Sequence, residues 1–272
     1  MCGICALVKK TEFNEEDNLH LMDMGSAIKS RGPDATEIFR SLNFGFLHNR
    51  LSIIGDSDKA AQPMHSKNNR YTIIFNGEIY NYKNLAYRYK LDVEGSDTRL
   101  LIELIDRVGI KTAVNIIEGM YAFIVLDSEE KCFYFITDRY GQKPIYYSFY
   151  RNFFSLSSEL SSFRNKNFKI DRQSLDSFIR FGHVPLPHSM YKGVKRAKPG
   201  HLYKINKNLE IASNPVLETR ASVDNMSASF LSNVIKNHLE SDVPVCTFLS
   251  SGVDSAIVTS LASQHKDLTA FT

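Results

Sequence analysis

Four strand-like runs in succession constrain the fold of this chain more than any other feature. Runs rich in aromatic and β-branched residues occupy 121–127, 133–137, 145–149 and 152–157, and short turns separate them. One of these turns is 138–144, which contains a Gly and a Pro. Short apolar runs alternating with turns are typical of antiparallel structure, so we predict a meandering antiparallel sheet over 121–157.

Further elements are predicted on both sides of this series. Strands are expected at 4–8, 44–48, 71–75 and 199–205, and helices at 15–30, from 94–98 to about 108, and at 173–181. In the first helix, the apolar side is expected to contain Leu19, Met22, Ala27 and Ile28. Strands facing strands, with helices outside, predict two stacked sheets covered on both faces.

The last part of the chain has a different pattern. Residues 206–227 show weak periodicity and are interpreted as a linker, after which we predict a helix at 228–239, a short buried strand at 244–249 and a helix at 256–262. The hydroxyl-rich loop 250–255 joins that strand to the helix. Such a loop can hold phosphate, although a capped turn explains the same residues, and the Gly-Lys-Ser/Thr ending of a Walker loop is absent.

Composition excludes several classes of function. The 33 basic and 30 acidic residues are spread along the chain, which gives no electrostatic case for nucleic acid or an anionic membrane. No run approaches the ~20 apolar residues of a membrane span, and no secretion signal is visible. The four cysteines, Cys2, Cys5, Cys132 and Cys246, lack metal-binding spacing. We therefore expect reduced thiols, no metal site and a cytoplasmic protein.

Cys2 is the candidate nucleophile. Removal of Met1 is expected to be efficient when the second side chain is small, and the mature chain would then begin with Cys2. Its α-amine would titrate at about 7.7–8.0, so part of it is a free base near neutral pH and can take the thiol proton. One residue would then supply both nucleophile and base. Taken alone, a cysteine at this position is more often incidental.

Two charged residues could bind the ends of an amino acid. Arg50 follows a predicted strand, where its guanidinium group could bind a carboxylate through two hydrogen bonds. Asp97 precedes a predicted helix and could bind an α-ammonium group. The structural alternatives are a surface arginine and a helix cap formed by Ser96 or Asp97.

Two glycine-containing segments have two readings each. Asn76-Gly77 follows a predicted strand and is first of all a hairpin turn. Alternatively, the Asn76 amide and the Gly77 N–H form an oxyanion hole, with glycine allowing the substrate to approach the backbone. The segment 31–34, Arg-Gly-Pro-Asp, could bind substrate, but we favour a structural role.

Taken together, these stretches closely resemble the glutamine-hydrolysing asparagine synthetases. The matching segments follow the family's order along the whole chain: 1–4, 31–34, 48–53, 62–64, 76–81, 95–97, 138–141, 157–159 and 250–255. The resemblance implies an α+β fold, a four-layer α/β/β/α N-terminal-nucleophile hydrolase sandwich followed by an incomplete α/β nucleotide-binding domain. It implies a glutaminase domain at 2–206, a linker at 207–227 and the start of an ATP-pyrophosphatase-type synthetase domain at 228–272.

The resemblance also implies roles for individual residues. Cys2 would attack the side-chain amide of L-glutamine, and Asn76 and Gly77 would stabilise the oxyanion. Arg50, Glu78 and Asp97 would bind the substrate's charged groups. The backbone around four residues would line the same pocket: Leu51, Ser52, Ile53 and Ile54. Seven residues would bind ATP: Leu249, Ser250, Ser251, Gly252, Val253, Asp254 and Ser255.

The implied cofactors and partners differ between the two halves. The glutaminase half needs no cofactor, whereas a complete synthetase would use ATP, magnesium and aspartate, and a homodimer is one assembly to expect. About 45 residues follow position 227, whereas a doubly wound nucleotide domain typically needs more than about 100. We therefore expect a truncated product or a fragment that cannot make asparagine alone.

Two further departures from the family pattern bear on the sites. Arg99 stands where the family usually has an acidic residue, and it would change the charge of the glutamine pocket if it pointed inward. Ser251 replaces the first glycine of the phosphate loop and would be strained if that position needed positive φ.

Other functions remain open at this stage. A related amidotransferase could amidate another carboxylate, such as a sugar acid in polysaccharide synthesis. Amidotransferases that act on phosphoribosyl or fructose phosphates are disfavoured by the loop 250–255. A non-catalytic module that binds an amino acid or a partner subunit is the alternative from a different class.

Overall fold

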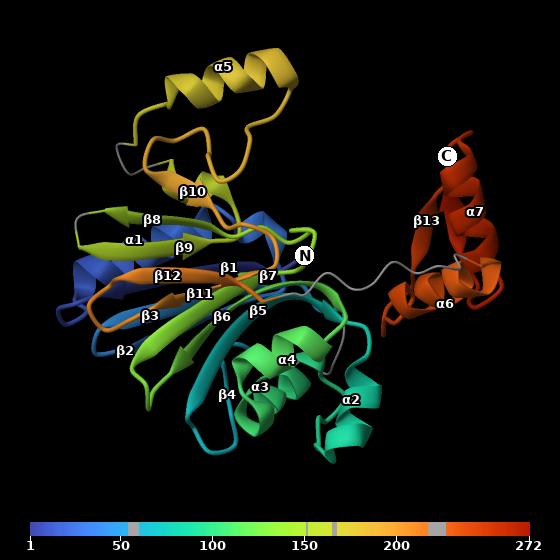
Figure 1. Ribbon diagram of the computed structural model, residues 1–272, viewed down its shortest axis with the longest axis horizontal. Coiled ribbons are helices and arrows are strands. Elements are labelled where there is room, and N and C mark those ends of the chain that lie inside the picture. The colour runs from blue at the N-terminus through green and yellow to red at the C-terminus, as the bar shows by residue number, and fades with distance from the viewer. Residues whose placement is uncertain (54–59, 151, 165–167, 217–226) are drawn as a thin grey trace.

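Two six-stranded antiparallel sheets stack face to face. The computed structural model describes residues 1–53, 60–150, 152–164, 168–216 and 227–272 (Figure 1). The first sheet contains, in order, β10 (Val194–Arg196), β8 (Tyr146–Tyr150), β9 (Phe153–Ser157), β1 (Gly3–Lys9), β3 (Phe44–Arg50) and β2 (Ala35–Ser41). The second contains β12 (Ile211–Pro215), β11 (His201–Ile205), β7 (Cys132–Thr137), β6 (Gly119–Asp127), β5 (Tyr71–Ile79) and β4 (Met64–His65).

Helices cover the outer faces of both sheets. On the first sheet lie α1 (Glu15–Ser26) and the short 3-10 turns η1 (Lys29–Arg31) and η2 (Leu160–Phe163). On the second sheet lie α2 (Tyr82–Tyr89), α3 (Asp97–Val108) and α4 (Ile110–Ile116). A further helix, α5 (Arg172–Phe181), projects beyond β10 (Figure 1). The predicted α/β/β/α sandwich is therefore confirmed.

Alternation along β1 shows how the layers hold together. Ile4 and Ala6 point into the core between the sheets, where they meet Phe46 of β3 and Phe135 of β7. Cys5, between them, points outward into the core under α1. Residues of a strand face alternate sides, so a strand buried on both faces is apolar at every position. Full burial of a large apolar side chain such as that of Ile4 or Phe46 contributes roughly 1.5–3 kcal/mol to the stability of the folded state.

The predicted meander over 121–157 is wrong. β6 and β7 belong to the second sheet, whereas β8 and β9 belong to the first, so the chain crosses between the sheets at 138–145. A buried carboxylate fixes this crossover: Asp138 accepts hydrogen bonds from the backbone N–H groups of Tyr140 (3.0 Å), Gln142 (3.1 Å) and Lys143 (3.1 Å). The sequence pattern of two successive hairpins is the same whether both hairpins lie in one sheet or each lies in a different sheet.

Helix α1 is shorter than predicted and faces the sheet differently. It ends at Ser26, and Leu19 and Met22, which we expected on its apolar side, are 56% and 47% exposed. The buried apolar side chains of the helix are Leu21 and Met24, and Ile28, just beyond its end, is buried in the same cluster. The capping box of Asn14 with Asp17 sets this start and therefore this rotation.

Residues beyond 206 extend the second sheet. Within the predicted linker, 211–215 form β12, which pairs with β11 although every residue of β12 is exposed. The unit that follows consists of α6 (Ala228–His238), β13 (Cys246–Phe248), α7 (Val253–Ala262) and β14 (Thr269–Phe271), with β13 parallel to β14. We predicted a buried strand here, but Phe248 is 84% exposed because only β14 pairs with β13 in the described part of the chain.

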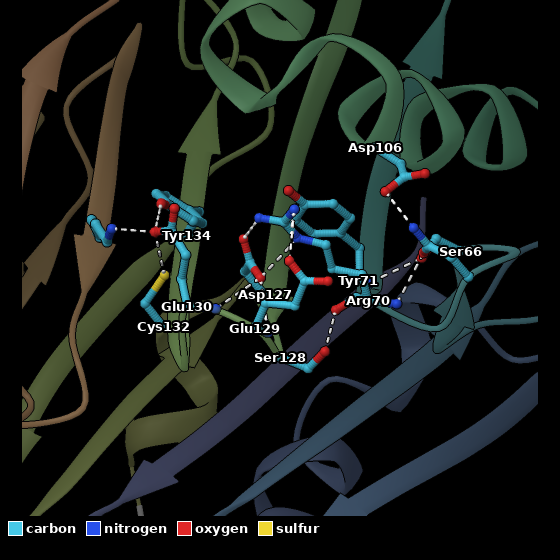
Figure 2. A network of polar contacts seen from close by, with 12 residues as sticks. Ser66, Arg70, Tyr71, Asp106, Asp127, Ser128, Glu129, Glu130, Cys132 and Tyr134 are labelled. Carbon is cyan, nitrogen blue, oxygen red and sulfur yellow. Dashed lines mark hydrogen bonds and ion pairs between the residues drawn. The ribbon is translucent and has the colours of Figure 1, made fainter.

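Side-chain contacts are found at both ends of β5. At the start of β5, Arg70 forms two hydrogen bonds with Asp127 at the end of β6, of 3.1 and 2.8 Å (Figure 2). Just after β5, the ring of Tyr80 packs at a tilt against the ring of His238 of α6, with centroids 4.3 Å apart. No helix in the described ranges is long and apolar enough to cross a membrane.

Candidate active site

One pocket gathers most of the residues that the sequence singled out. It lies where β1 begins, β3 ends and α3 begins, beside the last part of β5. Eight predicted residues line it: Cys2, Arg50, Leu51, Ile53, Asn76, Gly77, Glu78 and Asp97. Ser52 does not line this pocket in the described structure; its N–H donates to Asp34 Oδ2 at 2.8 Å. Ile54 falls outside the described residues.

The Cys2 side chain lies against the backbone of Leu51. The Leu51 N–H donates to Cys2 Sγ at 3.5 Å, and the Leu51 carbonyl oxygen lies 3.6 Å from the same sulfur. Burial raises the pKa of the Cys2 thiol, and the contacts with Leu51 offset this only in part. The thiol is therefore protonated near neutral pH and needs a base before it can attack.

The segment 31–34 holds the nucleophile in place. Arg31 Nε donates to the Cys2 carbonyl oxygen at 3.1 Å, and its Nη1 lies 3.4 Å from Glu159 Oε2. Asp34 accepts from Ser52, as described above, and its N–H donates to the Arg50 carbonyl oxygen at 3.0 Å. The structural role that we favoured for this segment agrees with these contacts.

Asn76 and Gly77 lie within β5, so the hairpin reading of this dipeptide is wrong. The Asn76 side chain is 1% exposed, and its Nδ2 has no hydrogen-bond partner among the described residues. Buried amide donors are nearly always paired, so an open donor beside Cys2 indicates a site for a ligand oxygen. A Cβ on Gly77 would lie 2.2 Å from the Met120 carbonyl oxygen of β6. Glycine is needed there because the neighbouring strand approaches closely.

Opposite charges lie in the same pocket. Arg50 at the end of β3 is 7% exposed, and Asp97 at the start of α3 is 5% exposed. Ser96 caps α3 through Arg99 N (3.2 Å), and Asp97 Oδ2 instead accepts from Ile79 N at 3.1 Å. Burial raises the pKa of Asp97 to about 6. A buried acid and a buried base of this kind suit a zwitterionic ligand.

Comparison with known proteins decides the family. A family model described as "Glutamine amidotransferase domain" matches residues 1–214, and one described as "Asparagine synthase" matches 227–272. The chain belongs to the glutamine amidotransferase domain family. The relationship that the sequence motifs indicated is thereby confirmed.

Individual relatives of this amidotransferase chain support the assignment. Asparagine synthetase [glutamine-hydrolyzing] 1 of Bacillus subtilis is 30% identical over 291 residues, covering 100% of this chain and 45% of the relative. Asparagine synthetase [glutamine-hydrolyzing] 3 of the same organism is 30% identical over 286 residues, covering 97% of this chain and 46% of the relative. The chain spans between 45% and 58% of the length of the first relatives that it matches.

A solved structure has the same fold. Glutamine phosphoribosylpyrophosphate amidotransferase from B. subtilis, complexed with ADP and GMP, superposes with a TM-score of 0.57 and 16% identity. The match covers 99% of this chain and 65% of that one. At this identity the likeness establishes the fold alone.

Sequence reasoning assigned no site role to seven other residues that line the amidotransferase pocket: Met1, His48, Ala60, Gln62, Phe75, Thr98 and Lys143. His48 is 1% exposed, and neither ring nitrogen has a hydrogen-bond partner among the described residues. Burial lowers its pKa to about 3, so its ring is neutral. Its place in the segment 48–53 was a usable signal. Lys143 gave no such signal, because a lysine in a turn is normally exposed.

Arg99 is not among the described residues that line the candidate pocket of the amidotransferase domain. Its Nη1 donates to the His65 carbonyl oxygen at 2.6 Å and lies 3.3 Å from Glu103 Oε1. The departure from the family pattern at this position therefore leaves the charge of the pocket lining unchanged.

The loop after β13 is closed by hydroxyl groups. Ser250 Oγ and Ser255 Oγ lie 2.8 Å apart, and the Gly252 N–H donates to Ser250 Oγ at 3.2 Å. Ser251 is not among the described residues with positive φ, so serine is unstrained at this position. The strand, loop and helix arrangement expected of a phosphate-binding turn is present, and α7 begins at Val253.

Proposed function

We propose that the chain hydrolyses the side-chain amide of L-glutamine to glutamate and ammonia once Met1 has been removed. The observation that carries this proposal is the pocket itself. It combines the Cys2 thiol, the open amide donor of Asn76 and two opposite buried charges, Arg50 and Asp97. These groups match the electrophilic centre and the two charged ends of glutamine.

Binding uses the charged residues. The Arg50 guanidinium group holds the substrate α-carboxylate through two hydrogen bonds. Asp97 and Glu78 hold the α-ammonium group, whose positive charge favours the ionised form of both carboxylates. The side-chain amide then points to Cys2 at the other end of the pocket.

The chemistry proceeds at the Cys2 residue. Its α-amine takes the thiol proton, and Sγ attacks the amide carbon to form a tetrahedral oxyanion. The Asn76 Nδ2 and Gly77 N–H groups donate to this oxyanion. When the C–N bond breaks, the α-ammonium group returns its proton and ammonia leaves a thioester. Water, deprotonated by the same amine, attacks the thioester, which releases glutamate and restores the thiol.

We further propose that the ammonia amidates aspartate in an ATP-dependent reaction. The match of 227–272 to the asparagine synthase model and the names of the relatives support this acceptor. The loop from Leu249 to Ser255 would hold the pyrophosphate part of ATP, and the unstrained backbone at Ser251 is compatible with that role. Magnesium would neutralise the phosphate charge when ATP is bound.

The proposal is tested by assaying the purified chain after mass spectrometry has confirmed loss of Met1. We expect equal amounts of glutamate and ammonia from L-glutamine in the absence of ATP, and no products from D-glutamine. A processed, folded chain that releases neither product from L-glutamine would overturn the proposed activity.

Replacing Asp97 with asparagine is expected to weaken glutamine binding and to stabilise the free protein. The folded pKa of about 6 lies above the ordinary value of 3.8. The carboxyl group therefore favours the folded state below pH 4, and this contribution is lost as pH rises through 6, at a cost on the order of 3 kcal/mol. Asparagine can still accept the hydrogen bond from Ile79 but avoids that cost.

Two measurements check the Asp97 prediction. The melting temperature of the wild type is expected to fall between pH 4 and pH 8 relative to that of Asp97→Asn, while KM for glutamine rises by roughly 10²-fold in the variant. An unchanged KM would show that Asp97 does not hold the α-ammonium group. Parallel stability profiles would contradict the raised pKa.

A further inference from the structure

Lys143 is a buried cation in the candidate active site. It lies on the crossover between β7 and β8, lines the candidate active site and is 5% exposed. Its backbone is fixed, because its N–H donates to Asp138 Oδ2 at 3.1 Å and Arg196 Nη2 binds the Gly141 carbonyl oxygen of the same turn at 3.1 Å. The fixed backbone of the crossover therefore holds the Lys143 side chain in the pocket.

The Lys143 ammonium group has no carboxylate within ion-pair distance in the described part of the chain. Its Nζ instead lies 2.9 Å from the sulfur of Met1. A buried charge without an ion pair costs stability, and such residues concentrate at functional sites. Burial also lowers the pKa of Lys143, because loss of water contact penalises the charged form.

Loss of Met1 changes what Lys143 faces. The sulfur that its ammonium group contacts is removed, and the backbone nitrogen of Cys2 becomes a free amine in the same pocket. We propose that Lys143 is a positioning residue for the nucleophile: its ammonium group faces the Cys2 α-amine across the space that Met1 fills and keeps that amine unprotonated. This inference rests on the proposed glutaminase function, which needs the amine as a free base.

Other charged groups also influence the electrostatic environment of the N-terminal amine. Arg31 adds positive charge beside the N-terminus, whereas Glu78 and, when it is ionised, Cys2 oppose it. Further charges shift the pKa values of these groups. Asp138 raises that of Lys143, and His238 lowers that of Glu78. Arg50 lowers the pKa of Cys2, and Asp97 raises it. In the chain with Met1, burial lowers the pKa of the terminal amine, and Lys143 and Arg31 lower it further. The same two cations remain after processing.

The test is the pH profile of kcat/KM for glutamine in Lys143→Met, which keeps the length and loses the charge. Without the cation the amine pKa rises, so the acidic limb is expected to move to higher pH by roughly half to one unit. Activity then falls by roughly three- to ten-fold at pH 6.5 and stays near wild type at pH 9. Lys143→Arg keeps the charge and is expected to keep the wild-type profile.

The controls separate this role from a structural one. Lys195→Met, on the exposed side of β10, removes a positive charge elsewhere and should leave the limb unmoved. Lys143→Gln provides a second neutral variant, and melting temperatures identify any variant that fails to fold. A folded neutral variant whose limb stays in place, or whose activity falls equally at every pH, overturns the role of Lys143. Absence of hydrolysis in the wild type would instead overturn the proposed function.

Discussion

Replacing Cys2 with alanine is expected to abolish glutamine hydrolysis, lowering kcat by at least about 10³-fold. The variant keeps the α-amine, Arg50 and Asp97, so glutamine still binds. Among the described residues that line the pocket, Cys2 is the one with a thiol. Cys5 points outward into the core under α1, where burial raises its pKa to about 11. Steady-state release of glutamate and ammonia measures the loss.

Covalent capture tests the same residue independently. A glutamine-analogue electrophile such as diazo-oxo-norleucine should add once to the wild type, as measured by intact mass, and not at all to Cys2→Ala. Cys246→Ala is the matched control, because Cys246 is an exposed free thiol far along the chain. That variant should be captured like the wild type. If a correctly processed wild type formed no adduct, a non-catalytic binding module would be the better interpretation.

Replacing Asn76 with alanine is expected to lower kcat by roughly 10²–10³-fold and to change KM little. The Asn76 Nδ2 group has no partner among the described residues, so the folded protein loses no hydrogen bond from this donor. The amide donor acts only when negative charge develops on the substrate oxygen. Single-turnover rates with saturating glutamine measure this effect without interference from product release.

A second variant at the same position sharpens the Asn76 prediction. Asn76→Asp has almost the same shape, but a carboxylate cannot donate and repels an oxyanion, so its kcat should be at least as low as that of Asn76→Ala. A rise in KM at constant kcat in both variants would show that Asn76 binds the ground state instead. The yield of the electrophile adduct at Cys2 reports whether the nucleophile remains in place.

The layers of the fold could be predicted because they follow from apolar alternation. Strands near 4–8, 44–48 and 71–75 are buried on both faces, and uninterrupted apolar runs reveal such strands. Edge strands could not be found in this way. β2 and β12 have largely exposed side chains and are held by backbone pairing to one neighbour. Their sequences therefore resemble those of loops.

The candidate site was predictable where residues fall in an ordered set of motifs that the family shares. A cysteine at position 2, an arginine at a strand end and Asn-Gly in a motif each suggested a role before their contacts were known. Lys143 could not be found, because its position depends on hydrogen bonds from backbone N–H groups to a buried carboxylate. The sheet to which β8 belongs was hidden for the same reason. Local patterns do not encode which layer a hairpin joins.

The central position of β1 has a consequence for biosynthesis. β1 is paired on one side with β3 and on the other with β9, and all residues from Gly3 to Lys9 are buried. Met1 and Cys2 directly precede this buried strand, so little extended chain is accessible to an aminopeptidase once the sheet has formed. Methionine excision is therefore expected on the ribosome, ahead of folding. In a recombinant preparation, specific activity should be proportional to the fraction of chains that lost Met1 before folding. Refolding should not restore activity to the chains that retain Met1.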